Sequence, residues 1–496
     1  MVGQIKVVPR DSLVLKIRTS FYFLRSRFMN GFLNFFTGTL NTVAWIYILL
    51  PCVFIGGIIF TIGNKGIQFS HFGYVMKNTI GKMFKHREAG EGAVTPLQAV
   101  TTALAATVGT GNIVGTAQAI SMGGYGAVFW LWIAALLGMV IKYSEVTLSL
   151  NFREKNKKGD WVGGPMYYIK NGLSKKWRWL AYAFAIFAAL AAFGIGNMSQ
   201  ANSITGSLND LILAFNPEFT GMNAVCWVVG IVLAFTTGLV LLGGIKRIGS
   251  VTEKLIPIMS LLYIIISLVV IFGHIENIGN VFKLIFTAAF NTKAVMGAAS
   301  GIVLKNAIVW GLRRSAFSNE AGLGSAGIAH SASTIKHPVV QGFYGIFEVF
   351  MDTIVICSLT AITIIISGVD IEWGVKPGSS LITAAFSTIL GPRIASLFVA
   401  IALMLFAYST ILGWSLYGVR CTEFLFGEKA GRPYQLIFIL VIIVGCVSPV
   451  SIVWDLADTL NGLMAIPNFI ALFLLSPVVF RLTREHFEGE RLENHK

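Results

Sequence analysis

Charged residues are scarce in this 496-residue chain, since Asp, Glu, Lys and Arg make up 12% of it and 55% is hydrophobic. Soluble domains carry about 25% charged residues, so the composition is not that of an ordinary soluble protein. The mean hydropathy is +0.74, and apolar runs repeatedly reach the length of about 20 residues that a helix needs to cross a bilayer. The sequence therefore predicts an all-α, multi-pass membrane protein.

The chain also lacks the motifs of several catalytic classes. Its five cysteines have no CxxC spacing, its seven histidines are scattered, and neither an H-E-x-x-H nor a G-x-x-x-x-G-K-[ST] motif occurs. The cysteines are therefore interpreted as small core residues, and an intramembrane enzyme or an ATP-driven pump is disfavoured. We expect no cofactor, and energy for any transport would come from an ion gradient.

About eleven membrane spans are predicted from the apolar runs. Their approximate limits are 41–63, 96–121, 125–150, 178–202, 222–243, 252–273, 296–316, 341–367, 394–418, 434–453 and 459–480. These limits divide the chain into a basic N-terminal extension (1–40), one transmembrane transporter domain (41–480) and a cytoplasmic tail (481–496).

Basic residues lie in particular loops. The loop 151–178 is rich in Lys and Arg, so the positive-inside rule places it in the cytoplasm, and alternation places Arg313 and Arg314 there too. The loop 203–221 has no Lys or Arg, and the loop between the last two spans has only Asp455 and Asp458, which fits the outer face. The net charge of +15 follows this topology, so no nucleic-acid partner is expected.

The N-terminal extension breaks this rule, because an odd number of spans puts it outside although it is basic. The first span is misassigned, or the extension is an amphipathic surface segment, or translation starts at Met29. A mass of the native protein that matches the full length would exclude the third explanation.

The segment Thr107–Gly115 holds three glycines and Asn112 in the middle of a run, 96–122, that contains no charged residue. Such a composition predicts a discontinuous helix, whose freed backbone groups bind a substrate and a coupling ion in transporters. The alternative is a GxxxG packing face between Gly111 and Gly115. If the span 41–63 is set apart, the other ten divide into two halves of five, which predicts an inverted repeat with a broken first helix in each half.

Several motifs together resemble the alanine or glycine:cation symporter family. They are TVGTGNIVG at 107–115, GGYGAVFW at 123–130, GGPMYY at 163–168, GIGNMSQAN at 194–202 and FSNEAGLGS at 317–325. The resemblance extends over residues 41 to 480. It implies a LeuT-like five-plus-five fold with one extra N-terminal helix, in a plasma (cell inner) membrane symporter that carries a small neutral amino acid with Na⁺.

The candidate substrate-binding residues lie on three predicted helices. N–H groups at the first break would bind the carboxylate of an amino acid, and the resemblance makes two amide residues after Gly194 substrate or gate candidates, although polar helix ends are often simply hydrated. Ser300-Gly301 is the expected break of the second discontinuous helix, with Trp310 deeper in it. The complete set is Gly109, Thr110, Gly111, Asn112, Gln200, Asn202, Gly301 and Trp310.

The candidate Na⁺ ligands are oxygen atoms, as a hard cation requires. Freed carbonyls of Ala105 and Val108 would face the adjacent hydroxyls of Ser409 and Thr410 on the span 394–418, and a hydroxyl pair on this helix has that role in LeuT-like transporters. The alternative is that both hydroxyls bond to carbonyls one turn earlier in their own helix.

Charges predicted inside the membrane are functional candidates. Lys305 would pair with Glu348 or Asp352, which lie four residues apart, or these carboxylates would make transport sensitive to protons. Arg313, Arg314 and Glu320 are expected at the cytoplasmic edge, as an inner gate or as anchors.

The predicted function is secondary symport of alanine or glycine with Na⁺. The alternatives are a proton-coupled or glutamine-preferring transporter of the same fold. An ion channel is disfavoured, because channels prefer an oligomeric pore with repeated filter loops.

Overall fold

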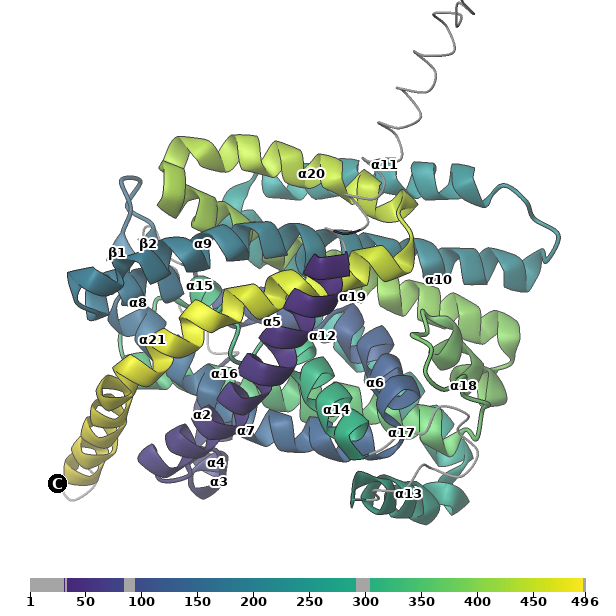
Figure 1. Ribbon diagram of the computed structural model, residues 1–496, viewed down its shortest axis with the longest axis horizontal. Helices are drawn as coiled ribbons and strands as arrows, with labels where there is room; N and C mark the ends of the chain where they lie inside the picture. The colour runs from purple at the N-terminus through teal and green to yellow at the C-terminus, as the bar shows by residue number, and fades with distance from the viewer. Residues whose placement is uncertain (1–30, 32–33, 84–93, 291–303, 494–496) are drawn as a thin grey trace, which may run out of the picture.

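A computed structural model describes residues 31, 34–83, 94–290 and 304–493. Most of the expected N-terminal extension, and Gly301 with its predicted break, lie outside the described residues. In Figure 1 the helices run mainly lengthwise, and α21 (Val450–Glu493) crosses α2 (Leu50–Gly63).

The first half of the chain is helical apart from one short hairpin. Its helical elements are η1 (Phe35–Leu40), η2 (Val43–Leu49), α2, α3 (Ile67–Ser70), α4 (Phe72–Met83), α5 (Pro96–Thr107), η3 (Gly111–Gly115), α6 (Thr116–Gly123), α7 (Gly126–Asn151), α8 (Pro165–Gly172), η4 (Lys175–Trp177), α9 (Arg178–Phe193), η5 (Gly194–Met198), α10 (Ser199–Phe215), α11 (Met222–Leu241), α12 (Gly244–Gly273), η6 (Ile275–Asn277) and α13 (Ile278–Phe290). The antiparallel hairpin joins β1 (Glu154–Lys155) and β2 (Trp161–Val162).

The elements described in the second half are all helices. Its elements are α14 (Leu304–Asn319), α15 (Ala326–His330), α16 (Pro338–Val349), η7 (Phe350–Cys357), α17 (Ser358–Ile366), α18 (Ser380–Leu390), α19 (Pro392–Phe426), η8 (Glu428–Ala430), α20 (Gly431–Val447) and α21.

Within the described ranges, nine helices are long and apolar enough to cross a membrane, which confirms a multi-pass helical membrane protein. They are Phe35–Gly63, Gly126–Asn151, Lys175–Phe215, Met222–Leu241, Gly244–Gly273, Pro338–Ile366, Pro392–Phe426, Glu428–Val447 and Val453–Gly489. The predicted count of eleven is not reached by continuous helices. Two further apolar segments, one from α5 to α6 and one from α14 to α15, are each interrupted.

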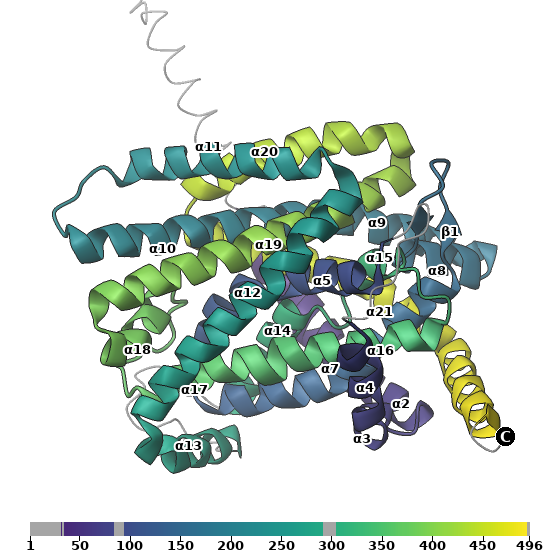
Figure 2. The same cartoon turned by 180° about the vertical axis from the view of Figure 1, so that it is seen from behind.

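The two ends of the bundle differ. The β1–β2 hairpin and α8 lie at one end, called here the hairpin end, and α18 and the α10–α11 loop lie at the other, the far end (Figures 1 and 2). At the hairpin end, Val94 N–H donates to the Ala332 carbonyl and Thr334 N–H donates to the Val94 carbonyl. At the far end, Gly374 N–H donates to the Ser121 carbonyl. Backbone bonds therefore join the two broken segments to each other at the hairpin end and join the first one to the 367–379 loop at the far end.

The first broken helix has a defined beginning and end. Thr95 and Gln98 form a capping box at the start of α5, with Pro96 in the first turn, and this combination satisfies N–H groups that a helix start leaves unpaired. α5 ends at Thr107, and Val108 has non-helical dihedrals (φ −76°, ψ 87°). A helix then resumes as the π-helical turn η3. The break predicted from the glycine-rich segment is therefore present.

Candidate functional site

The break after α5 is stabilised by side chains. Gly109 N–H donates to Asn112 Oδ1 at 2.8 Å, and Thr110 N–H donates to Gln200 Oε1 at 3.3 Å. In a continuous helix Gly109 N–H would bond to the Ala105 carbonyl, so Asn112 leaves this carbonyl without its intrahelical donor. The N–H groups of Gly109 and Thr110, two of the candidate substrate residues, are therefore engaged by side chains in this conformation.

The freed Ala105 carbonyl faces the predicted hydroxyl pair. Thr410 Oγ1 lies 3.0 Å from it and Ser409 Oγ lies 3.4 Å from it, and both side chains are buried. Both hydroxyls also lie within hydrogen-bonding distance of the Phe406 carbonyl in their own helix. Both predicted arrangements of Ser409 and Thr410 therefore occur together: contact with the freed Ala105 carbonyl and bonding to a carbonyl one turn earlier in their own helix. Val108 caps α5 at the same level, so the structure brings the four predicted ion-binding residues to one break.

Close packing requires small residues at the break. A Cβ atom on Gly109 would lie 2.3 Å from Thr410 Oγ1, and one on Gly111 would lie 3.1 Å from Ser318 Cα. Gly111 thus packs against α14, as the GxxxG alternative expects, but Gly115 is less constrained, with 3.7 Å to Arg314 Cδ. Helix packing and the break coexist in this segment.

Two of the predicted substrate residues lie elsewhere than expected. Asn202 donates to the carbonyls of Gly445 and Ser448, so its amide joins α10 to the end of α20 rather than reaching the break. Trp310 is half-buried in α14, beside the guanidinium groups of Arg313 and Arg314. Gln200, by contrast, directly contacts the first break.

The second break lies at residues 320–325, between α14 and α15. Glu320 has a positive φ of 57°, and Gly322 and Gly324 have φ of 89° and 79°, values that glycine adopts readily and other residues rarely do. The Glu320 carboxylate accepts hydrogen bonds from Ser325 Oγ and from Trp414 Nε1. The FSNEAGLGS motif, which sequence reasoning used only as a family signature, therefore forms this break.

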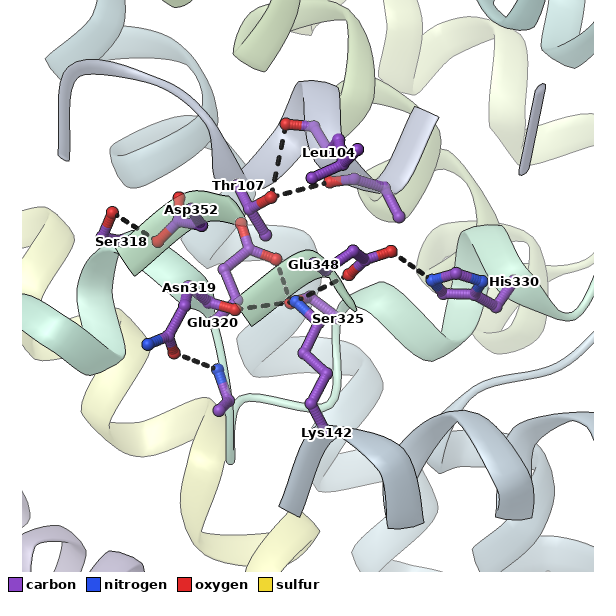
Figure 3. A network of polar contacts seen from close by, with 12 residues as sticks. Leu104, Thr107, Lys142, Ser318, Asn319, Glu320, Ser325, His330, Glu348 and Asp352 are labelled. Carbon is purple, nitrogen blue, oxygen red and sulfur yellow. Dashed lines mark hydrogen bonds and ion pairs between the residues drawn. The ribbon is translucent and has the colours of Figure 1, made fainter. Parts of the chain in front are cut away.

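Asp352 connects the two breaks. It lies in the π-helical segment η7, is fully buried, and accepts hydrogen bonds from Asn112 Nδ2 at 2.6 Å, Ser318 Oγ at 2.9 Å and Thr353 Oγ1 at 2.8 Å. Asn112 follows the first break and Ser318 precedes the second. A single carboxylate thus fixes the position of one break relative to the other, and Figure 3 shows its contact with Ser318.

A buried network of charged groups supports the second break (Figure 3). Lys142 Nζ donates to the Asn319 carbonyl at 2.7 Å and lies 3.2 Å from Glu348 Oε2, and His330 contacts the other oxygen of Glu348. The predicted pairing of Lys305 with Glu348 or Asp352 is therefore wrong, because Lys305 is exposed and Lys142 of α7 occupies that position.

Asn468 adds a contact from α21. Its Nδ2 donates to the Gly322 carbonyl at 2.9 Å and to Glu145 Oε1 at 2.6 Å. Sequence reasoning missed Lys142, Glu145, His330 and Asn468. The signal for the first two was available, since two charges three residues apart in the span 125–150 are costly in lipid.

Arg313 and Arg314 lie toward the far end, so their predicted position at the cytoplasmic edge is wrong. Both guanidinium groups pair with Asp458 Oδ2, at 2.7 and 2.8 Å. Asp458 lies early in α21, near the loop that the sequence assigns to the outer face. The break at residues 320–325 follows α14, so both arginines precede it and lie on its far-end side.

No group of three or more His, Cys, Asp or Glu side chains that could hold a metal ion occurs in the described part of the chain. The oxygen atoms at the first break are carbonyl and hydroxyl groups, which suit a hard monovalent cation rather than a transition metal.

The fold is that of LeuT-fold membrane proteins. The crystal structure of MhsT in complex with L-phenylalanine aligns over 80% of this chain and 99% of its own, with a TM-score of 0.56 at 14% sequence identity, which shows a shared fold.

The chain belongs to the sodium:alanine symporter family, whose model matches residues 30–496. It is 41% identical over 459 residues to the sodium/alanine symporter AgcS of Methanococcus maripaludis, covering 92% of this chain and 97% of that relative. It is 36% identical over 461 residues to a protein of Bacillus subtilis named "Probable sodium/glutamine symporter GlnT", covering 92% and 91% of the two chains. The resemblance seen in the motifs is thereby confirmed.

Proposed function

We propose that this protein is a secondary symporter of the plasma membrane that takes up alanine, glycine or a related small neutral amino acid together with Na⁺. The observation that carries the proposal is the freed Ala105 carbonyl beside the Thr410 and Ser409 hydroxyls, 3.0 and 3.4 Å away. Na⁺ takes oxygen ligands, and Val108 would supply a further carbonyl. The two interrupted segments would complete eleven spans, with α5–α12 and α14–α21 as inverted repeats.

The site also explains how ion and substrate would depend on each other. The Na⁺ ligands and the candidate substrate residues Gly109, Thr110 and Gly111 lie within one unwound stretch of backbone, next to Gln200. An ion that holds the Ala105 carbonyl against α19 fixes this stretch, and a fixed stretch needs less ordering when the amino acid binds. Binding of one ligand then favours binding of the other by the same factor.

Uptake by reconstituted protein tests the proposal. Proteoliposomes with an inward Na⁺ gradient should accumulate labelled alanine or glycine, whereas vesicles with no gradient should only equilibrate. The double variant Ser409→Ala/Thr410→Val should raise the Na⁺ concentration for half-maximal uptake. Thr422→Val is the matched control, because Thr422 is buried in the same helix, about three turns from Thr410, and its hydroxyl donates to the Gly418 carbonyl. Unchanged Na⁺ dependence in the double variant would contradict this ion site.

Proton coupling is the second candidate, and buried Asp352 favours it. A carboxylate surrounded by the neutral donors Asn112, Ser318 and Thr353 can hold a proton in place of a cation. Accumulation under an inward proton gradient without Na⁺ would support this alternative.

Glutamine is the first competing substrate, given the relative named for it. Unlabelled glutamine that abolishes the uptake of labelled alanine would show that both amino acids use the same site.

A further inference from the structure

Asn461 of α21 is a fully buried residue, and neither atom of its side-chain amide has a hydrogen-bond partner among the described residues. An amide left unpaired in an apolar interior is unfavourable, because it loses its hydrogen bonds to water without replacement. Other polar side chains on the buried face of this helix are bonded: Asp458 to two arginines and Asn468 to Gly322 and Glu145.

The position of Asn461 along α21 places it level with the second break. Residues seven apart lie on one stripe of a helix, and Asn461 lies midway between Trp454 and Asn468. Trp454 stacks on Phe317, with ring centroids 5.2 Å apart, and Asn468 donates to the Gly322 carbonyl. The stripe therefore follows residues 317 to 322 of the neighbouring segment. Asn461, midway along the stripe, faces the start of the second break at residue 320.

The direction in which Asn461 projects from α21 places it opposite the boundary between η5 and α14, called here the seam. It lies one turn beyond Ala457 and Asp458, in a direction between theirs. Ala457 packs against Gly194 of η5, where an added Cβ would lie 2.9 Å from Ala457 Cα. Asp458 pairs with Arg314 of α14.

The first break contacts both walls of the same seam. On one side Thr110 N–H donates to Gln200, whose own Nε2 donates to the Ile195 carbonyl of η5. On the other side Gly111 packs on Ser318 of α14. Thr110 Oγ1 is a second buried polar atom without a partner in the described chain. Thr110 at the first break and Asn461 on α21 thus both carry buried polar atoms without a partner in the described chain, on two elements whose contacts lead to η5 and α14.

We infer that Asn461 binds the transported amino acid, with Oδ1 accepting from its ammonium group and Nδ2 donating to its carboxylate. An amide presents one acceptor and one donor side by side, which complements the ammonium and carboxylate groups on a single α-carbon. This recognition depends on the zwitterion and leaves the side chain of the substrate to be selected by packing. The inference rests on the proposed amino-acid transport.

Unfolding of the purified full-length protein in Na⁺, with and without L-alanine, tests the role of Asn461. Without alanine, Asn461→Leu should unfold at the same temperature as the wild type or higher, because it removes an unpaired buried amide. With alanine, the rise in unfolding temperature should be lost, with at least about a tenfold weaker affinity. The rise caused by Na⁺ alone should remain, since the predicted ion ligands are on other residues.

Thr363→Val is the matched control. Thr363 of α17 is fully buried, and its hydroxyl also has no partner in the described part of the chain. This variant should keep the full response to alanine. A full alanine response in Asn461→Leu, or a lower unfolding temperature of that variant without alanine, would overturn the role of Asn461 and leave the proposed function intact. A wild type that no neutral amino acid stabilises and that shows no Na⁺-driven uptake would overturn both.

Discussion

The side-chain Nδ2 of Asn112 lies 2.6 Å from Oδ1 of Asp352, while Oδ1 of Asn112 accepts the backbone N–H of Gly109 at 2.8 Å. One amide therefore performs two tasks. It keeps α5 from continuing past Val108, and it connects the first break to a carboxylate that also receives Ser318, next to the second break. The geometry of the two breaks is coupled through this single side chain.

Asn112→Leu should reduce the free energy of unfolding by about 3 kcal/mol. The variant removes a donor from the buried Asp352 carboxylate and the acceptor of Gly109 N–H, and a hydrogen bond to a charged group contributes about 1.5 to 3 kcal/mol. With Gly109 N–H released, the Ala105 carbonyl can return to an intrahelical bond. The Na⁺ concentration for half-maximal uptake should therefore rise.

Asn197→Leu is the control for this prediction. Asn197 is also fully buried, but its amide donates to the Phe438 carbonyl, away from both breaks. It should lose about 1 kcal/mol of stability with unchanged Na⁺ dependence. Equal shifts in Na⁺ dependence in both variants would show that Asn112 has no special role at the break.

Gly109→Ala should abolish Na⁺-driven uptake, whereas Gly115→Ala should transport nearly normally. The new methyl group at position 109 would lie 2.3 Å from Thr410 Oγ1 and 3.3 Å from Gln200 Oε1, so it displaces the hydroxyl proposed to bind the ion. At position 115 the nearest atom is Arg314 Cδ at 3.7 Å, an ordinary contact. Uptake of labelled alanine, normalised to protein in the membrane, distinguishes the two, and similar activities would contradict the close-packing argument.

The first break could be predicted from the sequence because its signal is local. Three glycines and an asparagine in an uncharged span oppose a continuous helix wherever they occur. The pairing of Ser409 and Thr410 with Ala105 is predicted from the oxygen ligands that Na⁺ requires and from the family resemblance. The structure brings these residues together. The hydrogen bond from Gly109 N–H to Asn112 Oδ1 could not be predicted, because no local sequence pattern indicates it.

The break at residues 320–325 could not be predicted from the sequence alone. The glycine-rich stretch 296–316 predicts a break at Ser300-Gly301, which lies outside the described residues, whereas 317–325 is typical of a polar loop after a span. Its polar groups are buried only because α7, α16, α19 and α21 supply partners such as Lys142, Trp414 and Asn468. Those partners come from distant parts of the sequence, so the burial of this loop depends on tertiary structure.

Lys142→Met should destabilise the protein by about 3 to 5 kcal/mol, the usual effect of removing one partner from a buried ion pair. Lys142 and Glu348 are both fully buried, 3.2 Å apart, and Lys142 also holds the Asn319 carbonyl. Adding Glu348→Gln should restore part of the loss, since the remaining carboxylate charge is removed. Unfolding of the two single variants and the double variant gives the coupling energy, and strictly additive losses would show that the pair does not act as a unit.

Asp458→Asn should impair both stability and uptake far more than Asp455→Asn, although both acids pair with basic residues near the far end. Asp458 is completely buried between Arg313 and Arg314, so its neutral variant leaves a buried guanidinium without its counter-charge, at a cost of about 3 to 5 kcal/mol. Asp455 pairs with Lys376, and both of these side chains are about one-third exposed, so that pair contributes about 0 to 1 kcal/mol.

Comparing the Asp458 and Asp455 variants also distinguishes an effect on stability from an effect on transport. The Arg314 guanidinium lies over Phe317 and Trp454, 5.1 and 5.5 Å from their ring centroids, so the Asp458 pair joins α14 to α21 beyond the second break. If the proposed amino-acid transport requires the far end to open, these contacts would break on opening and reform on closing. If Asp458→Asn is stable in detergent yet still transports at the rate of Asp455→Asn, the pair does not take part in closure; loss of uptake in a folded variant would show that it does.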